Sequence, residues 1–141
     1  MKDKEIYINT ILQDIFNLSD PKIQEVRKGA ISEFINTSIN GDTINAHLVI
    51  DVMLNNKSGV YVYILTDVRL IQIQIDADKE ISSLTYLLSE IIGVERKLID
   101  TNRIEIQIIF KNGLVGLKYS EQEQKITVFF QKVEQAWAKR G

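Results

Sequence analysis

Alternation of apolar and polar residues over a long central segment is the feature that most constrains this fold. Between Thr43 and Tyr119 the hydrophobic period is two, which is the period of a β-strand that buries one face. The clearest run extends from Ile44 to Leu54, where every even-numbered position is apolar. The central segment therefore predicts a mainly β domain.

Turn signals divide this segment into strands. The clusters at residues 55–59 and 111–113 each predict a hairpin. The Asn40-Gly41 pair, a strong hairpin signal, favours a further strand over residues 30–39, although apolar residues at helical spacing leave open a continued helix there. We expect seven strands, at about 30–39, 44–54, 60–66, 70–76, 91–97, 103–110 and 115–119. Residues 76–89 are expected to hold a short helical turn.

The hydrophobic period is helical at both ends of the chain. An apolar stripe predicts a first helix over residues 6–18, and Ser19-Asp20-Pro21 predicts the start of a second helix that ends at Gly29. Residues 121–140 carry an aromatic-rich stripe and predict a closing helix. We expect residues 1–29 to form a helical extension packed on a domain of residues 30–141. The alternative is an exposed stripe, formed by Ile8, Ile11, Leu12 and Ile15, that docks on a partner or dimerises.

Composition narrows the class of partner. The 141 residues carry a formal net charge of −2, which lacks the basic surface that nucleic acid requires. The chain has no cysteine, so neither a disulfide nor a thiolate metal site is expected. Its amino terminus mixes both charge signs, and its densest apolar run, Val60 to Leu65, is too short to cross a bilayer. The sequence therefore predicts a cytoplasmic protein that does not bind nucleic acid.

The predicted pattern is a seven-stranded antiparallel barrel or orthogonal sandwich capped by a carboxy-terminal α-helix, with one or two amino-terminal helices. At residues 59–71, GVYVYILTDVRLI, the chain resembles the bacterial pleckstrin-homology-like (PH-like) superfamily, which is related to GRAM domains. Residues 88–95 and the turn at 111–113 continue the resemblance, and Trp137 is similar to a tryptophan that the family's closing helix often packs on the sheet. The resemblance covers about residues 30–140 and carries no catalytic motif.

Candidate reactive residues are few. His47 is the single histidine, which excludes a multi-histidine metal site, and we expect it on the outer face of a sheet. No serine lies in a nucleophile elbow, and Gly113 and Gly116 lie in a hairpin instead of at a helix start. We therefore expect no catalysis, no metal and no cofactor. Among basic residues, Arg69 and Lys111 are the two candidates for an anionic ligand near the barrel mouth.

These observations lead to one functional hypothesis and one alternative. We expect a non-catalytic PH-like interaction module that binds a protein partner or itself, through a sheet edge or the amino-terminal helices. The alternative is a peripheral binder of anionic lipid or a small ligand at the open end of the barrel, where relatives of the family carry basic clusters. Here the corresponding segment, Asn40-Gly41-Asp42, brings an acid, which counts against lipid.

Overall fold

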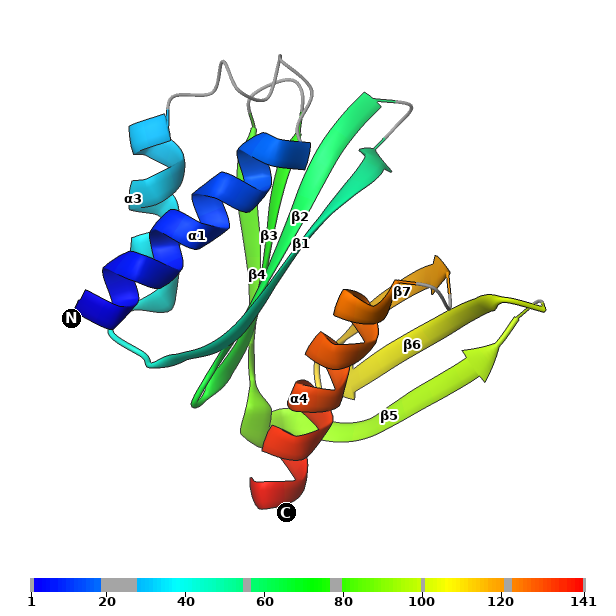
Figure 1. Ribbon diagram of the computed structural model, residues 1–141. Coiled ribbons are helices and arrows are strands. Elements are labelled where there is room, and N and C mark those ends of the chain that lie inside the picture. The colour runs from blue at the N-terminus through cyan, green and yellow to red at the C-terminus, as the bar shows by residue number, and fades with distance from the viewer. Residues whose placement is uncertain are drawn as a thin grey trace. The chain divides into compact units, whose positions relative to one another are not determined.

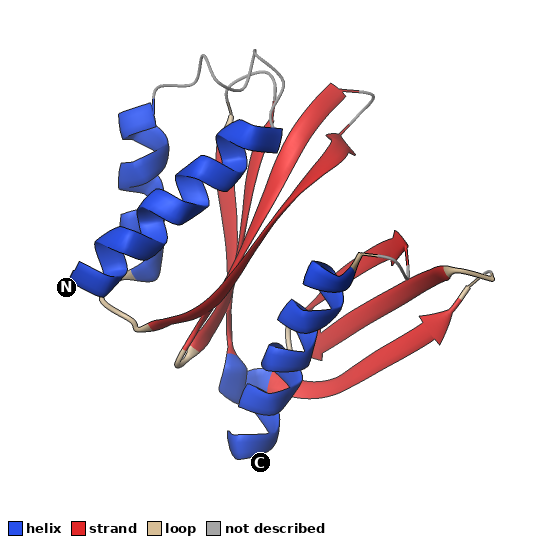
Figure 2. Cartoon of the chain, in the orientation of Figure 1, coloured by secondary structure: helices blue, strands red, loops and turns tan. Residues whose placement is uncertain are grey.

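The protein is seen as two compact units in a computed structural model. The structure describes residues 2–18, 28–54, 57–76, 80–99, 101–120 and 123–140. The first unit spans Met1–Thr85 and the second Tyr86–Gly141. The chain passes from one unit to the other within strand β4 (Ile81–Leu87). Figure 2 shows that helices and strands occur in both units.

The first unit is a four-stranded antiparallel sheet covered on one face by two helices. Its elements are α1 (Lys2–Leu18), α3 (Lys28–Ile39), β1 (Ile44–Leu54), β2 (Lys57–Thr66), β3 (Arg69–Asp76) and β4. The strands lie in the order β1-β2-β3-β4. Helix α1 packs on β1 and β2, while α3 packs on α1 and β3 (Figure 1).

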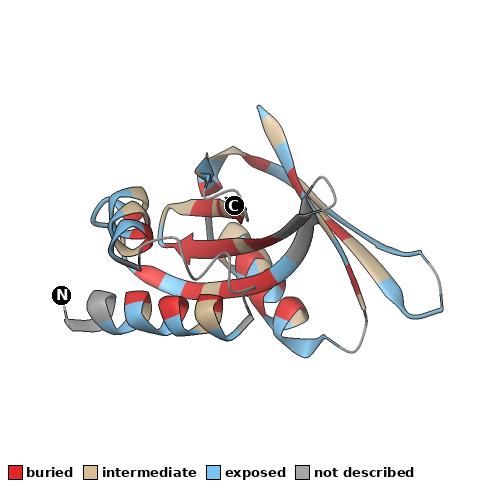
Figure 3. Cartoon of the chain, turned by 90° about the horizontal axis from the view of Figure 1, so that it is seen from above, coloured by how far each residue is buried: buried red, intermediate tan, exposed pale blue. Residues whose placement is uncertain are grey.

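The core of this unit lies between the helices and the sheet. Strand register places Val62 beside Val49 on one side and Ile73 on the other, so these three side chains share one face of the sheet. The stripe of α1 is buried against this face, with Ile11 and Ile15 fully buried. Figure 3 shows the buried residues of α1 recurring along one side of the helix. The apolar stripe that the sequence predicted is therefore occupied within the chain.

The opposite face of the same sheet is also apolar and buried in part, with the half-buried Gln72 and Gln74 of β3 on the same side. It carries Leu48, Tyr63, Leu65 and Leu70. Burial, and then the neighbouring phenol of Tyr61, raises the pKa of the Tyr63 hydroxyl well above its ordinary value. Both faces of β2 are thus largely buried between Gly59 and Thr66, which accounts for the nearly continuous apolar sequence there.

The second unit is a three-stranded antiparallel sheet with one helix on its face. After the short 3₁₀ helix η1 (Leu88–Glu90), strands β5 (Ile91–Leu98), β6 (Arg103–Phe110) and β7 (Gly113–Ser120) form a sheet in that order. Helix α4 (Gln124–Arg140) lies across this sheet (Figure 1). Its buried residues are Ile126, Phe129, Phe130 and Val133.

Strand register brings the apolar residues of the second unit to the face that α4 covers. Ile108 is paired with Val94 and Val115, and Ile106 and Phe110 share its side of β6. The ring of Tyr86 stacks on Phe110, with ring centroids 4.3 Å apart. The opposite face is mostly polar, with Glu95 and Lys97 on β5 and further charged residues on β6 and β7, although Ile109 and Leu114 also lie on it.

One predicted strand is wrong. Residues 30–39 lie in helix α3, and Gly29 lies inside that helix instead of ending it. The Asn40-Gly41 pair ends α3, because both residues adopt positive φ angles, 50° and 83°, and the Asp42 amide donates to the Ile39 carbonyl oxygen at 3.1 Å. The same two residue types suit a hairpin turn and a helix end, since both need the left-handed backbone. The predicted helix start at residues 19–21 lies outside the described residues.

A second correction concerns which segments of the chain form the strands. The described residues form seven strands, the predicted number, but β4 replaces the predicted strand at 30–39, and the expected short helical turn is confined to η1. The antiparallel β class, the closing helix and the amino-terminal helices are confirmed. The described strands form two sheets that are not closed into a barrel, so the barrel is not confirmed, and α4 lies on a face of the second sheet. The predicted domain boundary at residues 29 and 30 stays a prediction.

Candidate interaction site

The free edge of β5 is the main candidate. Among the described residues, β5 pairs with β6 alone. The Ile99 amide donates to the Arg103 carbonyl oxygen at 2.9 Å, which sets the phase of the antiparallel ladder. Counting back along the continuous register, the amide and carbonyl groups of Val94, Arg96 and Leu98 point away from β6. These backbone groups are available to another strand.

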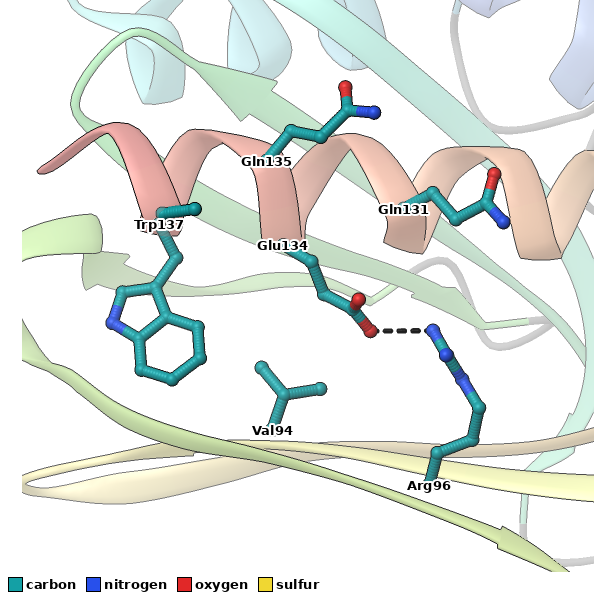
Figure 4. Close-up of a pocket in the computed structure, with 7 residues that line it drawn as sticks. Val94, Arg96, Gln131, Glu134, Gln135 and Trp137 are labelled. Atoms are coloured by element: carbon teal, nitrogen blue, oxygen red, sulfur yellow. Dashed lines mark hydrogen bonds and ion pairs between the residues drawn. The ribbon is translucent and has the colours of Figure 1, made fainter. Parts of the chain in front are cut away.

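A groove runs beside this edge, between β5 and α4. It has a volume of about 740 Å³, and it is lined by Val94, Arg96, Gln131, Glu134, Gln135, Trp137 and Ala138 (Figure 4). Trp137 extends from α4 towards the strand, and Val94 projects from the strand below it. The groove thus offers an apolar surface directly next to unpaired backbone.

One ion pair crosses the groove. The Arg96 guanidinium Nη2 lies 2.5 Å from Glu134 Oε1, and both side chains are partly exposed. An ion pair in contact with water contributes little to stability, roughly 0–1 kcal/mol. Both charged groups can therefore turn to a ligand at little cost to the fold.

The side chains of β5 mix exposed apolar and charged groups. Ile92 and Leu98 are 60% and 64% exposed, which is high for residues of this size. On the face away from α4, Lys97 Nζ lies 3.1 Å from Glu95 Oε1. This hydrogen bond, reinforced by the charge of Glu95, raises the pKa of Lys97 above its ordinary value. Charged residues on an edge strand usually hinder indiscriminate pairing with other strands.

Arg69, the first predicted ligand residue, is occupied within the first unit. Its Nε lies 3.3 Å from Asp42 Oδ2, and its amide donates to Thr66 Oγ1 at 2.8 Å. The Thr66 hydroxyl donates to the same carboxylate oxygen at 3.0 Å. In the same turn, Asp67 Oδ1 accepts from the Thr43 amide. Arg69 is therefore part of the polar contacts that hold the β2–β3 turn.

Lys111, the second predicted ligand residue, lies in the β6–β7 turn of the second unit. Its side chain is exposed, and its amide donates to the Glu90 carbonyl oxygen at 3.0 Å. The side chain of the next residue, Asn112, contacts the Glu90 carboxylate at 3.5 Å. An acidic group thus lies near this turn. Arg69 and Lys111 belong to different units, and as ligand residues both stay predictions.

His47 does not lie on an outer sheet face, contrary to the prediction. Its Nε2 lies 3.0 Å from Asp14 Oδ2 of α1, and its ring meets the edge of Tyr7. The helix covers this face of β1, which the sequence of β1 alone could not show. Within the described ranges, no three histidine or acidic side chains gather in a way that could hold a metal ion.

Comparison with known proteins bears on the fold. A similar solved structure is the crystal structure of a DUF1696 family protein with a pleckstrin-homology domain from Shewanella loihica PV-4. It aligns with a TM-score of 0.50 at 10% identity, over 74% of this chain and 95% of that protein. The fold is PH-like. No protein-family model and no curated protein matches the sequence.

The predicted PH-like resemblance is thus confirmed as a fold. Trp137 lies on the closing helix, at the side of the sheet where the resemblance put it. None of the helices in the described part of the chain has the length and hydropathy of a membrane span.

Sequence reasoning missed the β5 edge of this PH-like fold. The sequence predicts the strand itself, at about residues 91–97, but not its place at a sheet edge. Its signal is the run Glu95-Arg96-Lys97, where three consecutive charged residues interrupt the alternation. A strand with charge on both faces is typical of a sheet edge, so this run is the mark that identifies it.

Proposed function

We propose that this PH-like chain is a non-catalytic interaction module that binds protein segments, or a second copy of itself, at the free edge of β5. The observation that supports it is the juxtaposition of unpaired backbone at Val94, Arg96 and Leu98 with the groove beneath α4. An extended segment can add a strand to such an edge and place alternate side chains in the adjoining groove. A cytoplasmic location stays a prediction from the sequence.

Three physical features favour this mode of binding. Backbone hydrogen bonds provide affinity without requiring a particular sequence, while Trp137 and Val94 provide an apolar contact for one side chain. The Arg96–Glu134 pair presents one positive and one negative charge, so it can bind a charged side chain of either sign. An open groove of this kind suits a segment that lies along it better than a small ligand that must be enclosed.

The experiment is a selection from a displayed library of random linear peptides on the full chain. Selected peptides are titrated calorimetrically against wild type, Leu98→Pro and Leu98→Thr. Proline removes an amide that points away from β6, so it blocks strand addition and spares the ladder, whereas threonine keeps the amide. We expect binding to wild type and to Leu98→Thr, and a loss of at least about tenfold in Leu98→Pro, since several backbone hydrogen bonds depend on the added strand.

Two results would overturn the proposal. One is peptide binding that is equal in all three proteins. The other is the absence of both peptide binding and self-association. In that case the protein is tested for sedimentation on anionic liposomes that falls with salt and with Arg69→Ala or Lys111→Ala. Such sedimentation would establish the alternative function of a peripheral lipid binder.

A further inference from the structure

The charged residues along the free edge of β5 determine how this strand could pair with β5 of a second copy of the chain. Val94, Arg96 and Leu98 direct their backbone groups outwards, and Glu95 and Lys97 direct theirs to β6. In an antiparallel ladder between two identical edges, outward residues must therefore face outward residues. Only those registers remain in which one residue of the strand lies on the twofold axis and faces its own copy.

The side chains discriminate between those registers. An axis through Glu95 or Lys97 places two like charges directly opposite each other, which is unfavourable. An axis through Val94 places the two charged residues opposite Gly93 and Ile91, and an axis through Leu98 leaves little overlap. An axis through Arg96 instead places Glu95 of each copy opposite Lys97 of the other, twice over.

We propose that β5 pairs antiparallel with β5 of a second copy about a twofold axis through Arg96. In this register Val94 of each copy lies opposite Leu98 of the other, which covers a side chain that is 64% exposed in the single chain. Three outward amides on each strand donate across the interface, about six hydrogen bonds in all. The proposal rests on the proposed function, because it names the occupant of the same edge.

The two Arg96 side chains meet at the axis, which is the one contact between like charges. Each guanidinium is already paired with Glu134 of its own helix α4, so the four groups together carry no net charge. The Glu95–Lys97 ion pair within one chain is exposed, and exchanging it for the pair between chains costs little. Charge complementarity therefore favours a second copy over an arbitrary segment at this edge.

Charge reversal tests the register directly by analytical ultracentrifugation of the full chain at low salt. Glu95→Lys alone or Lys97→Glu alone places like charges opposite each other at two symmetric positions. We expect each single variant to dimerise at least about tenfold more weakly than wild type. The double variant restores opposite charges and should dimerise as wild type does. An equimolar mixture of the two single variants should form a heterodimer, because each supplies the charges that the other lacks.

Amide hydrogen exchange gives an independent readout of the same interface. The amides of Val94, Arg96 and Leu98 should exchange more slowly as protein concentration rises, whereas those of Glu95 and Lys97 are protected by β6 at every concentration. Thermal melts of each variant check that it folds.

The outcomes separate this inference from the proposed function. A monomer at every concentration overturns the dimer, as does a dimer that neither charge reversal nor Leu98→Pro affects. If that monomer still binds selected peptides in a manner that Leu98→Pro abolishes, the proposed function stands and its occupant is a foreign segment. A monomer without such peptide binding overturns both.

Discussion

Thr66 holds the β2–β3 turn through its hydroxyl, and removing that oxygen should be costly. The side chain is fully buried. Its hydroxyl donates to Asp42 Oδ2 at 3.0 Å and accepts from the amides of Val68 at 3.2 Å and Arg69 at 2.8 Å. Thr66→Val keeps the shape and removes all three hydrogen bonds.

The magnitude follows from the kind of bond that is lost. A hydrogen bond to a charged carboxylate contributes about 2 kcal/mol, and the two amides, which lie in a turn that water can reach in part, add about 1 kcal/mol together. We expect Thr66→Val to lower the free energy of unfolding by about 3 kcal/mol. Thr66→Ser is the matched control, since it keeps the hydroxyl and loses one buried methyl group, which costs about 1 kcal/mol.

Urea unfolding followed by far-ultraviolet circular dichroism measures both values. The reasoning predicts that valine is clearly worse than serine at this position. If Thr66→Val is as stable as Thr66→Ser or more so, the hydroxyl does not hold the turn, and packing of the methyl group is the larger contribution.

Three further predictions concern α1, a strand glycine and Lys97. Ile11→Ala should cost about 3 kcal/mol in urea unfolding because its side chain is fully buried, whereas Ile6→Ala on the same helix, where the side chain is exposed, should change stability by less than about 0.5 kcal/mol; equal losses would contradict the packing of α1. Gly113→Ala should cost about 1–3 kcal/mol, because a Cβ there would lie 2.8 Å from the Tyr86 ring that stacks on Phe110, while Gly116→Ala, with its nearest atoms at 3.6 Å, should be neutral or slightly stabilising; a harmless Gly113→Ala would refute that close contact. The pKa of Lys97, measured by nuclear magnetic resonance, should lie above the ordinary 10.5 and return towards it in Glu95→Gln. The Glu95–Lys97 pair therefore contributes to the stability of the fold at pH values below 10.5, and this contribution is lost as the pH rises through the raised pKa of Lys97. An unchanged pKa in Glu95→Gln would exclude Glu95 as the cause.

Local pattern predicted most strands of this fold because their burial has a simple period. Six of the seven observed strands coincide with alternating or apolar runs, including the hairpin between β6 and β7. Strand β4 was missed because it lacks that period. Its residues 82–85 are all exposed, so no apolar face marks it as a strand.

Helix α3 shows the opposite limit. Its sequence carries apolar residues at helical spacing, and Ile31, Ile35 and Ile39 are fully buried. The following Asn40-Gly41 pair favours a hairpin in the sequence, although it serves equally well as a helix end. What decides between the two is the packing of those three isoleucines against the sheet, a tertiary effect that a short window of sequence does not contain.

The candidate site was predictable only in outline. A sheet edge was expected as the binding surface, but which edge depends on strand order, and strand order is not encoded in the period of any one strand. The ion pair of Arg69 with Asp42 likewise joins residues far apart in the chain. That pairing depends on the folded chain, and the role of Arg69 as a ligand residue stays a prediction.

Each of the two units, which divide between Thr85 and Tyr86, contains one natural spectroscopic probe. The sole histidine, His47, lies in the first unit against Asp14 of α1, and the sole tryptophan, Trp137, lies in the second unit on α4. The imidazole proton resonance therefore reports on helix docking in one half, and indole fluorescence reports on the groove in the other, without any added dye. Recording both during one denaturant titration shows whether the halves melt together or in sequence, and so measures their thermodynamic coupling in the unmodified protein.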